Sequence, residues 1–198
     1  MSLPLPKETA EAAFSAADSL AWEAGRVERH EYLAGEVFAM TGASDAHATI
    51  TGNIFSALRS HLRGGPCQAF FAGMKLNVAA DDAFFYPDVF VTCAESDRAF
   101  QHFKRAPVLV VEVLSPGTAA FDRGGKFAAY RQVPGLQEYL LVDGESLSMD
   151  LFRRGEAGQW VLHPCDAAGG VYLESVDLVL PQALVYEDVE AMWASHAA

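Results

Sequence analysis

Hydrophobic and polar residues alternate along this chain in a pattern that predicts a mixed α/β domain. Residues 45–63 carry apolar side chains three and four positions apart, which is the spacing of a helix with one buried face. Residues 108–114 and 138–142 are short apolar runs, typical of strands that are buried on both faces. A predicted helix over residues 121–132 lies between these two strands, so the three segments predict a βαβ unit.

The remaining pattern predicts a mixed β-sheet flanked by helices, an α/β or α+β architecture. Short runs of β-branched and aromatic residues, separated by glycine, proline and aspartate, indicate further strands. A short helix over residues 186–193 is expected to close the chain. The further strands are expected over residues 27–33, 36–40, 68–78, 84–92, 147–152, 160–163, 171–173 and 177–180.

The N-terminal end is predicted to be a helical extension over residues 1–24, followed by the main domain over residues 25–198. The extension could pack on the domain or project from it, because its apolar stripe is modest. The stripe consists of Ala10, Ala13, Phe14, Ala17 and Leu20.

Composition and cysteine usage limit the class of protein. With 198 residues, 51% of them hydrophobic, the chain can bury one sizeable core. It shows neither a basic leader followed by an apolar segment nor a run of membrane-spanning length, so no membrane partner is expected. Cys67, Cys93 and Cys165 lack CxxC spacing and are predicted to be free, buried or half-buried thiols. Together these features predict a cytoplasmic protein.

The net charge of −12 argues against a polyanionic partner, because nucleic acids bind mainly through positive charge. One segment departs from this balance, since residues 98–131 hold six basic and two acidic residues. A solvated charged face is the ordinary interpretation of such a cluster, and a functional patch is the alternative.

Two acidic residues in apolar strands are the first candidates for chemistry. Glu112 interrupts the apolar run 108–114, and Asp88 directly precedes the apolar segment that begins at Val89. An ionised carboxylate without a partner would cost several kcal/mol of desolvation in such a position. Each acid should therefore meet a cation, a hydrogen-bond donor or a metal.

The predicted helix after Glu112 offers such a cation. Asp122, Lys126 and Tyr130 are four residues apart, which places them along one helix face. If this helix packs back on the sheet, Lys126 joins Glu112 and Asp88 in one pocket. Such a set suits metal-assisted phosphodiester hydrolysis, in which the acids hold Mg²⁺ or Mn²⁺ and the lysine positions water or offsets developing charge. Helix capping and an ordinary surface ion pair are the structural alternatives.

An ordered set of residues from the hairpin to the βαβ unit matches a known family. The matching residues are Gly35, Glu36, His47, Lys75, Tyr86-Pro87-Asp88-Val89, Val111-Glu112-Val113-Leu114-Ser115-Pro116, Thr118, Asp122, Lys126, Tyr130, Val133-Pro134-Gly135, Glu138-Tyr139 and Val142-Asp143. Over about residues 25–190, this succession resembles the bacterial restriction-endonuclease family Uma2, earlier catalogued as a domain of unknown function, within the PD-(D/E)XK nuclease superfamily. The resemblance implies a restriction-endonuclease-like sheet flanked by helices, Mg²⁺-dependent cleavage of DNA and a homodimer.

By this resemblance, Asp88 and Glu112 take the positions of the superfamily's two metal-binding acids. The usual lysine of the superfamily lies two residues after the second acid, where this chain has Leu114. Lys126 matches the lysine that this family carries on the following helix, so Asp88, Glu112 and Lys126 are the expected catalytic residues. Lys75 is the rival lysine, because it lies in a strand next to that of Asp88.

Four further residues are candidates for secondary roles. Glu36 could approach as a third acid, His47 could contact substrate or a catalytic acid, and Tyr130 could orient Lys126. A solvated turn, a polar helix end and a satisfied hydroxyl are their structural alternatives. Asp122 is the fourth candidate, and the aromatic residues Phe70, Phe71, Phe84, Phe85 and Phe90 are expected in the core.

Two other functions fit the sequence. A non-catalytic binding module that keeps the nuclease fold is favoured by the acidic composition. A metal phosphodiesterase acting on small nucleotides would avoid docking an acidic surface to DNA.

Overall fold

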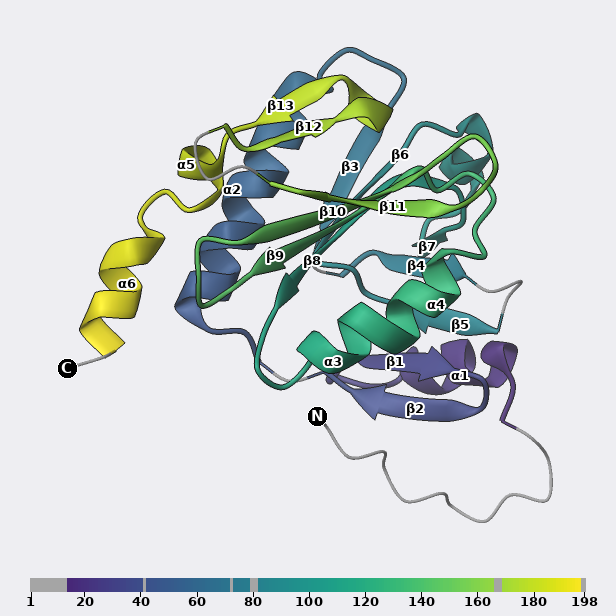
Figure 1. Ribbon diagram of the computed structural model, residues 1–198. Helices are drawn as coiled ribbons and strands as arrows, with labels where there is room; N and C mark the ends of the chain where they lie inside the picture. Colours follow the sequence, from purple (N-terminus) through teal and green to yellow (C-terminus); the bar gives the residue numbers. More distant parts are fainter. Residues whose placement is uncertain (1–13, 41, 72, 79–81, 166–168, 197–198) are drawn as a thin grey trace.

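Two β-sheets that share a hydrophobic core form the body of the computed structural model (Figure 1). The larger sheet has six strands in the order β11-β10-β9-β8-β6-β3, and the smaller has five in the order β2-β1-β5-β4-β7. The structure describes residues 14–40, 42–71, 73–78, 82–165 and 169–196.

The strands and helices have the following bounds. The six-stranded sheet contains β3 (Gln68–Phe71), β6 (Val89–Thr92), β8 (Pro107–Leu114), β9 (Glu138–Asp143), β10 (Met149–Arg154) and β11 (Trp160–Pro164). The five-stranded sheet contains β1 (His30–Leu33), β2 (Glu36–Ala39), β4 (Lys75–Val78), β5 (Ala83–Phe85) and β7 (Phe103–Lys104), and β12 (Val171–Leu173) pairs with β13 (Leu178–Leu180). The α-helices are α1 (Ala16–Glu23), α2 (Asp45–His61), α3 (Ala119–Phe121), α4 (Phe127–Tyr130), α5 (Gln182–Val185) and α6 (Val189–His196).

The predicted βαβ unit is confirmed. β8 and β9 are parallel neighbours, with Glu112 opposite Leu141. Their connection is helical, but it is not the single regular helix expected over residues 121–132. It consists of α3, a π-helical turn over Asp122–Lys126, and α4.

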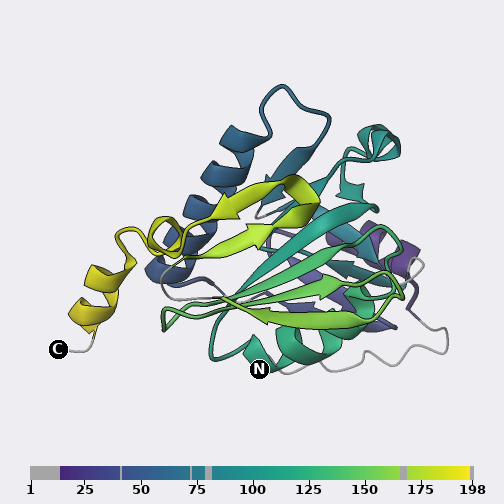
Figure 2. The same cartoon turned by 45° about the horizontal axis from the view of Figure 1, so that its top comes forward.

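Alternate residues of β8 face two different cores. Val111 and Val113 belong to the core that contains residues of α2, whereas Val110 and Leu114 belong to the core shared with α4 and the five-stranded sheet. Figure 2 shows α2 and the α3–α4 segment on opposite sides of the six-stranded sheet. Because side chains alternate along a strand, Glu112 points into the second core.

Two predicted strands are wrong in their extent. Residues 68–78 divide into β3 and β4, and residues 84–92 divide into β5 and β6, with the two halves of each in different sheets. Gly73, with φ +143°, lies at the first break. Pro87, which has no N–H to donate to a strand ladder, lies at the second. The second break places Asp88 where the chain passes from one sheet to the other.

The described part of the N-terminal extension is α1, which begins with a serine–aspartate capping box. Trp22 of α1 packs edge-on against His30 of β1, with ring centroids 4.7 Å apart. The predicted stripe positions Ala10 and Ala13 fall within residues 1–13, which lie outside the described residues.

At the other end of the chain, α6 begins three residues after the expected start at residue 186. It is attached through Trp193, whose Nε1 donates a hydrogen bond of 2.8 Å to the carbonyl of Gly144. None of the described helices is long and apolar enough to cross a bilayer.

The prediction of three free thiols is wrong, because Cys67 and Cys93 form a disulfide. Cys67 directly precedes β3 and Cys93 directly follows β6. In this antiparallel ladder Gln68 is paired with Thr92, so the two cysteines come next to that pair. Neighbouring strands therefore bring together two cysteines that are 26 residues apart in sequence. Cys165 is a half-buried free thiol. The prediction of a cytoplasmic protein rested partly on unpaired cysteines and loses that support.

We expect thiol titration of the denatured, unreduced protein to detect one thiol per chain, and three after reduction. Cys67→Ser should lower the free energy of unfolding by about 2–4 kcal/mol, because a disulfide limits the freedom of the unfolded chain. Urea denaturation measures this change, and Cys165→Ser is the control. Three reactive thiols before reduction would contradict the pairing.

Candidate active site

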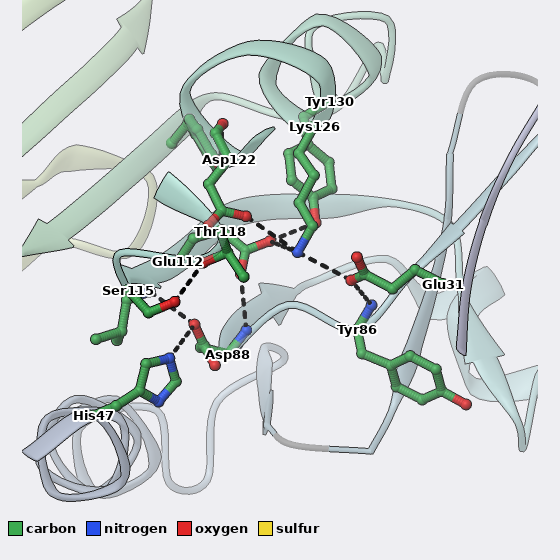
Figure 3. Close-up of polar contacts among 12 residues, drawn as sticks. Glu31, His47, Tyr86, Asp88, Glu112, Ser115, Thr118, Asp122, Lys126 and Tyr130 are labelled. Carbon is green, nitrogen blue, oxygen red and sulfur yellow. Dashed lines mark hydrogen bonds and ion pairs between the residues drawn. The ribbon is translucent and has the colours of Figure 1, made fainter. Parts of the chain in front are cut away.

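Glu112 lies at the centre of a buried polar cluster (Figure 3). Its Oε1 accepts hydrogen bonds from the Tyr130 hydroxyl at 2.9 Å and from Nζ of Lys126 at 3.3 Å. Its Oε2 accepts from the backbone N–H of Asp88 at 3.3 Å. The side chain is only 3% exposed. The buried glutamate thus meets the cation and the hydrogen-bond donors that its place in an apolar strand requires. Tyr130 was expected to orient Lys126, but its hydroxyl instead binds Glu112.

Asp88 lies at the solvent-exposed edge of this cluster, with its side chain 23% exposed. Its Oδ2 accepts the backbone N–H of Val113 at 2.7 Å and lies 3.4 Å from Nε2 of His47. Each acid therefore binds the backbone beside the other acid, which holds the two carboxylates next to each other. Burial alone would lower the pKa of His47, but the hydrogen bond and charge of Asp88 outweigh it and raise this pKa above its ordinary value.

Lys126 is surrounded by three carboxylates. Its Nζ lies 3.0 Å from Oε1 of Glu31, 3.3 Å from Oε1 of Glu112 and 3.2 Å from Oδ1 of Asp122. Burial alone would lower the pKa of Lys126, but these negative charges outweigh it and raise the pKa well above its usual range. The ammonium therefore keeps its charge although it is buried. Figure 3 shows that Lys126 points toward Glu112 from the segment that follows β8.

The third acid near the two predicted metal ligands is Glu31 and not Glu36. Glu31 is buried in β1, and its Oε1 also accepts the backbone N–H of Tyr86 at 3.0 Å. Glu36 is exposed at the start of β2, on the second strand of the same hairpin. The rival lysine, Lys75, forms its ion pair with Glu23 of α1. The structure therefore brings Asp88, Glu112, Asp122, Lys126, Tyr130, His47 and Glu31 together and directs Glu36 and Lys75 elsewhere.

The cluster carries more negative than positive charge. Its four carboxylates, from Glu31, Asp88, Glu112 and Asp122, face the ammonium of Lys126 and the imidazole of His47. Even with a protonated imidazole, the formal balance is −2. Burial raises the pKa of Glu112 well above its ordinary value. The charge of Lys126 lowers this pKa, whereas the charges of the neighbouring acids raise it further. A divalent cation would offset this excess charge.

The donor set fits a small divalent cation held by two residues. Among the residues that the structure describes, no three or more His, Cys, Asp or Glu side chains are arranged to hold a metal ion. Lys126 contacts Glu31, Asp122 and Glu112 alike, but Glu112 and Asp88 are the two acids that hydrogen bonds to each other's strand hold side by side, which favours them as the donors. Mg²⁺ commonly takes one or two carboxylates and completes its octahedral shell with water and substrate oxygens. Two adjacent carboxylates in a region of excess negative charge meet that requirement.

Gly125, in the π-helical turn that also contains Lys126, allows close packing against Phe121. A Cβ at Gly125 would lie 2.5 Å from Cε2 of Phe121. The ring of Phe121 packs against Phe38 and Phe85, with centroids 5.6 Å and 6.2 Å apart, so it has little room to move. The turn that carries Lys126 therefore depends on a residue without a side chain at this position.

We expect Gly125→Ala to lower the free energy of unfolding by about 1–3 kcal/mol, the usual cost of overpacking. It should also displace Lys126 and reduce any activity of the cluster. Gly124→Ala is the matched control, because a Cβ there would meet no described atom within 4 Å, and alanine favours a helix by about 0.5–1 kcal/mol. Thermal unfolding of both variants measures the difference, and equal stabilities would contradict the packing at Phe121.

We expect Glu31→Gln to lower metal affinity or activity by about 10- to 100-fold, the usual size of effect when an outer-shell partner of a metal site is lost. The variant removes one of the charges that hold Lys126 and weakens the support of the Tyr86 backbone. Glu36→Gln, in the same hairpin, should change neither quantity. Titration of Mn²⁺ into both variants by calorimetry measures this difference, and a larger effect at Glu36 would overturn the assignment of the third acid.

Comparisons with known proteins agree with this fold. A family model labelled Uma2, "Putative restriction endonuclease", matches residues 16–185. Two proteins of Synechocystis sp. are similar in sequence. Uncharacterized protein slr1290 is 37% identical over 185 residues, which cover 93% of this chain and 94% of that protein. Uncharacterized protein sll1609 is 34% identical over 151 residues, which cover 75% of this chain and 85% of that protein.

One solved structure is similar in fold. It is described as a crystal structure of "a putative nuclease belonging to DUF820 from Anabaena variabilis", with a TM-score of 0.70 and 18% sequence identity. The match covers 87% of this chain and 97% of that chain. The predicted restriction-endonuclease-like architecture is therefore confirmed.

Proposed function

This chain belongs to the Uma2 family, and on that premise we propose that it is a Mg²⁺-dependent endonuclease that hydrolyses DNA phosphodiester bonds. The family and the fold support a nuclease-type function. One observation carries the finer proposal: the carboxylates of Asp88 and Glu112 are held next to each other, beside the protonated Lys126 that binds Glu112, in a cluster whose excess negative charge a divalent cation would offset.

In this proposal, Asp88 and Glu112 hold Mg²⁺ or Mn²⁺, which when bound polarises a phosphoryl oxygen and lowers the pKa of a water molecule. Tyr130 and a backbone N–H fix Glu112, and His47 and a second backbone N–H fix Asp88. Both ligands are thus oriented before substrate arrives, which reduces the cost of assembling the site. Lys126 supplies a fixed positive charge that offsets negative charge on the phosphate or positions the attacking water.

Cleavage of supercoiled plasmid DNA tests this proposal. Nicking or linearisation should require Mg²⁺ or Mn²⁺, stop with a chelator, and disappear in Asp88→Asn. A protein that binds DNA but neither binds Mn²⁺ nor cleaves would be the binding module considered above. Hydrolysis of a small phosphodiester, without a DNA affinity that rises as salt falls, would instead indicate a small-nucleotide enzyme.

We also propose that the working form is a homodimer. A chain with one site cuts one strand, and two-fold symmetry would present two sites to the two strands of a duplex. Light scattering on the purified protein measures the mass directly. A monomer that makes double-strand breaks in single binding events would contradict this assembly.

A further inference from the structure

An exposed phenylalanine, Phe71, packs on the partly buried Phe55 near the candidate site. Phe71, at the end of β3, has 47% of its surface exposed, although the sequence pattern predicted a core residue. Its ring lies against that of Phe55 on α2, with centroids 4.1 Å apart and an angle of 30° between the planes. The side chain is thus held in place on one side and open to solvent elsewhere.

The strand register places Phe71 next to the acids. Phe71 is opposite Val89, and Val89 is opposite Val111, so these residues form one row across β3, β6 and β8. Asp88, which directly precedes β6, and Glu112 of β8 lie next to Val89 and Val111 at the same end of the sheet. From standard strand spacing, the Cα atoms of Phe71 and Asp88 lie about 6 Å apart.

Phe71 also lies on the side of the sheet from which His47 reaches Asp88. The side chain of Val89 packs in the core that contains residues of α2, and directly paired residues share a face. His47 and Phe55 are both on α2 and eight residues apart, so they lie on the same side of that helix. The aromatic pair therefore lies on the α2 side of the six-stranded sheet, opposite the face to which Glu112 points, and approaches the site at Asp88.

We propose that Phe71, supported by Phe55, is a stacking platform for an unpaired nucleobase next to the phosphodiester at Asp88 and Glu112. The inference rests on the proposed nuclease function and adds a substrate class, single-stranded nucleic acid or a strand locally opened. A chain with net charge −12 gains little from phosphate contacts, so binding to the base has to supply affinity. Aromatic stacking does this without regard to sequence, because every base has a π-face.

A double-mutant cycle between protein and ligand tests the platform. The probes are a fluorescent 12-nucleotide oligothymidylate and a 12-residue abasic strand of the same charge, with affinity measured by anisotropy in Ca²⁺ after checking that both strands stay intact. The wild type should bind the oligothymidylate roughly tenfold or more tighter than the abasic strand. Phe71→Ala should remove this preference, and Phe71→Tyr, which keeps a ring, should retain it.

Tyr172→Ala is the matched control, because Tyr172 is an aromatic residue of β12 with 46% of its surface exposed. It should bind both probes as the wild type does. The platform is overturned if Phe71→Ala and Tyr172→Ala behave alike, or if Phe71→Ala weakens both probes equally. A change of mass in Phe71→Ala by light scattering would also overturn it and identify the patch as a contact between two copies. If the wild type cleaves DNA with metal but shows no base preference, the platform fails while the nuclease function stands.

Discussion

Glu112→Gln is expected to lower metal-dependent cleavage by about 10³-fold or more, because metal catalysis supplies several kcal/mol of transition-state stabilisation and each 1.36 kcal/mol is tenfold in rate. The substitution removes one of the two carboxylates that are proposed to bind the metal. Glutamine keeps the size of the side chain, so the variant should still fold. Initial rates of plasmid nicking at saturating Mn²⁺ measure the effect.

Glu138→Gln is the matched control, since Glu138 is also a fully buried glutamate and lies on the neighbouring strand β9. Its carboxylate binds Arg153 and accepts backbone N–H groups of Glu174 and Ser175, which is a structural role. This variant should lose about 1–3 kcal/mol of stability, yet keep its activity below its melting temperature. If both variants lost activity in proportion to stability, Glu112 would be structural as well.

Lys126→Met is expected to lower the free energy of unfolding by about 3–5 kcal/mol, because it leaves buried carboxylates without their ammonium. The loss should depend on pH. Lys126 opposes the rise in the pKa of Glu112, so without it this pKa rises further, and Glu112 holds a proton in the folded state that the unfolded chain releases above a pKa of about 4. The folded state then binds more protons, so the stability of the variant falls as the pH rises from about 5 to 8. Urea denaturation across this range measures the trend.

Lys75→Met separates this effect from the general cost of removing a buried lysine. Lys75 is also buried, but it pairs with Glu23 and lies over the ring of Tyr86 at 5.6 Å. Its variant should lose stability and retain metal binding, whereas Lys126→Met should also lose cleavage. Retained cleavage in Lys126→Met together with loss in Lys75→Met would restore Lys75 as the catalytic lysine.

The sequence predicted the centre of the cluster from the local pattern around each of its members. Glu112 is a charge in an apolar strand, Asp88 follows a proline between two strands, and Lys126 shares a helix face with Asp122. The parallel pairing of β8 and β9 was also predicted, because parallel neighbours need a long crossover connection and a helix between two apolar strands supplies one.

What the sequence missed depends on contacts between distant segments. Glu31 and Glu36 lie in the same hairpin, and only the packing of β1 beside β5 decides that Glu31 is buried. The disulfide follows from the pairing of β3 with β6, which local spacing does not encode. Phe71 is the same residue type as the buried Phe84, Phe85 and Phe90, and its exposure follows from the edge position of β3.

Crystals of the full chain soaked in Mn²⁺ test the central claim most directly, through the anomalous scattering of the ion. We predict one Mn²⁺ per chain, bound by carboxylate oxygens of both Asp88 and Glu112, and its loss in Glu112→Gln. An ion bound elsewhere, or no ion between these two residues at saturating Mn²⁺, would contradict a metal-dependent site at this cluster.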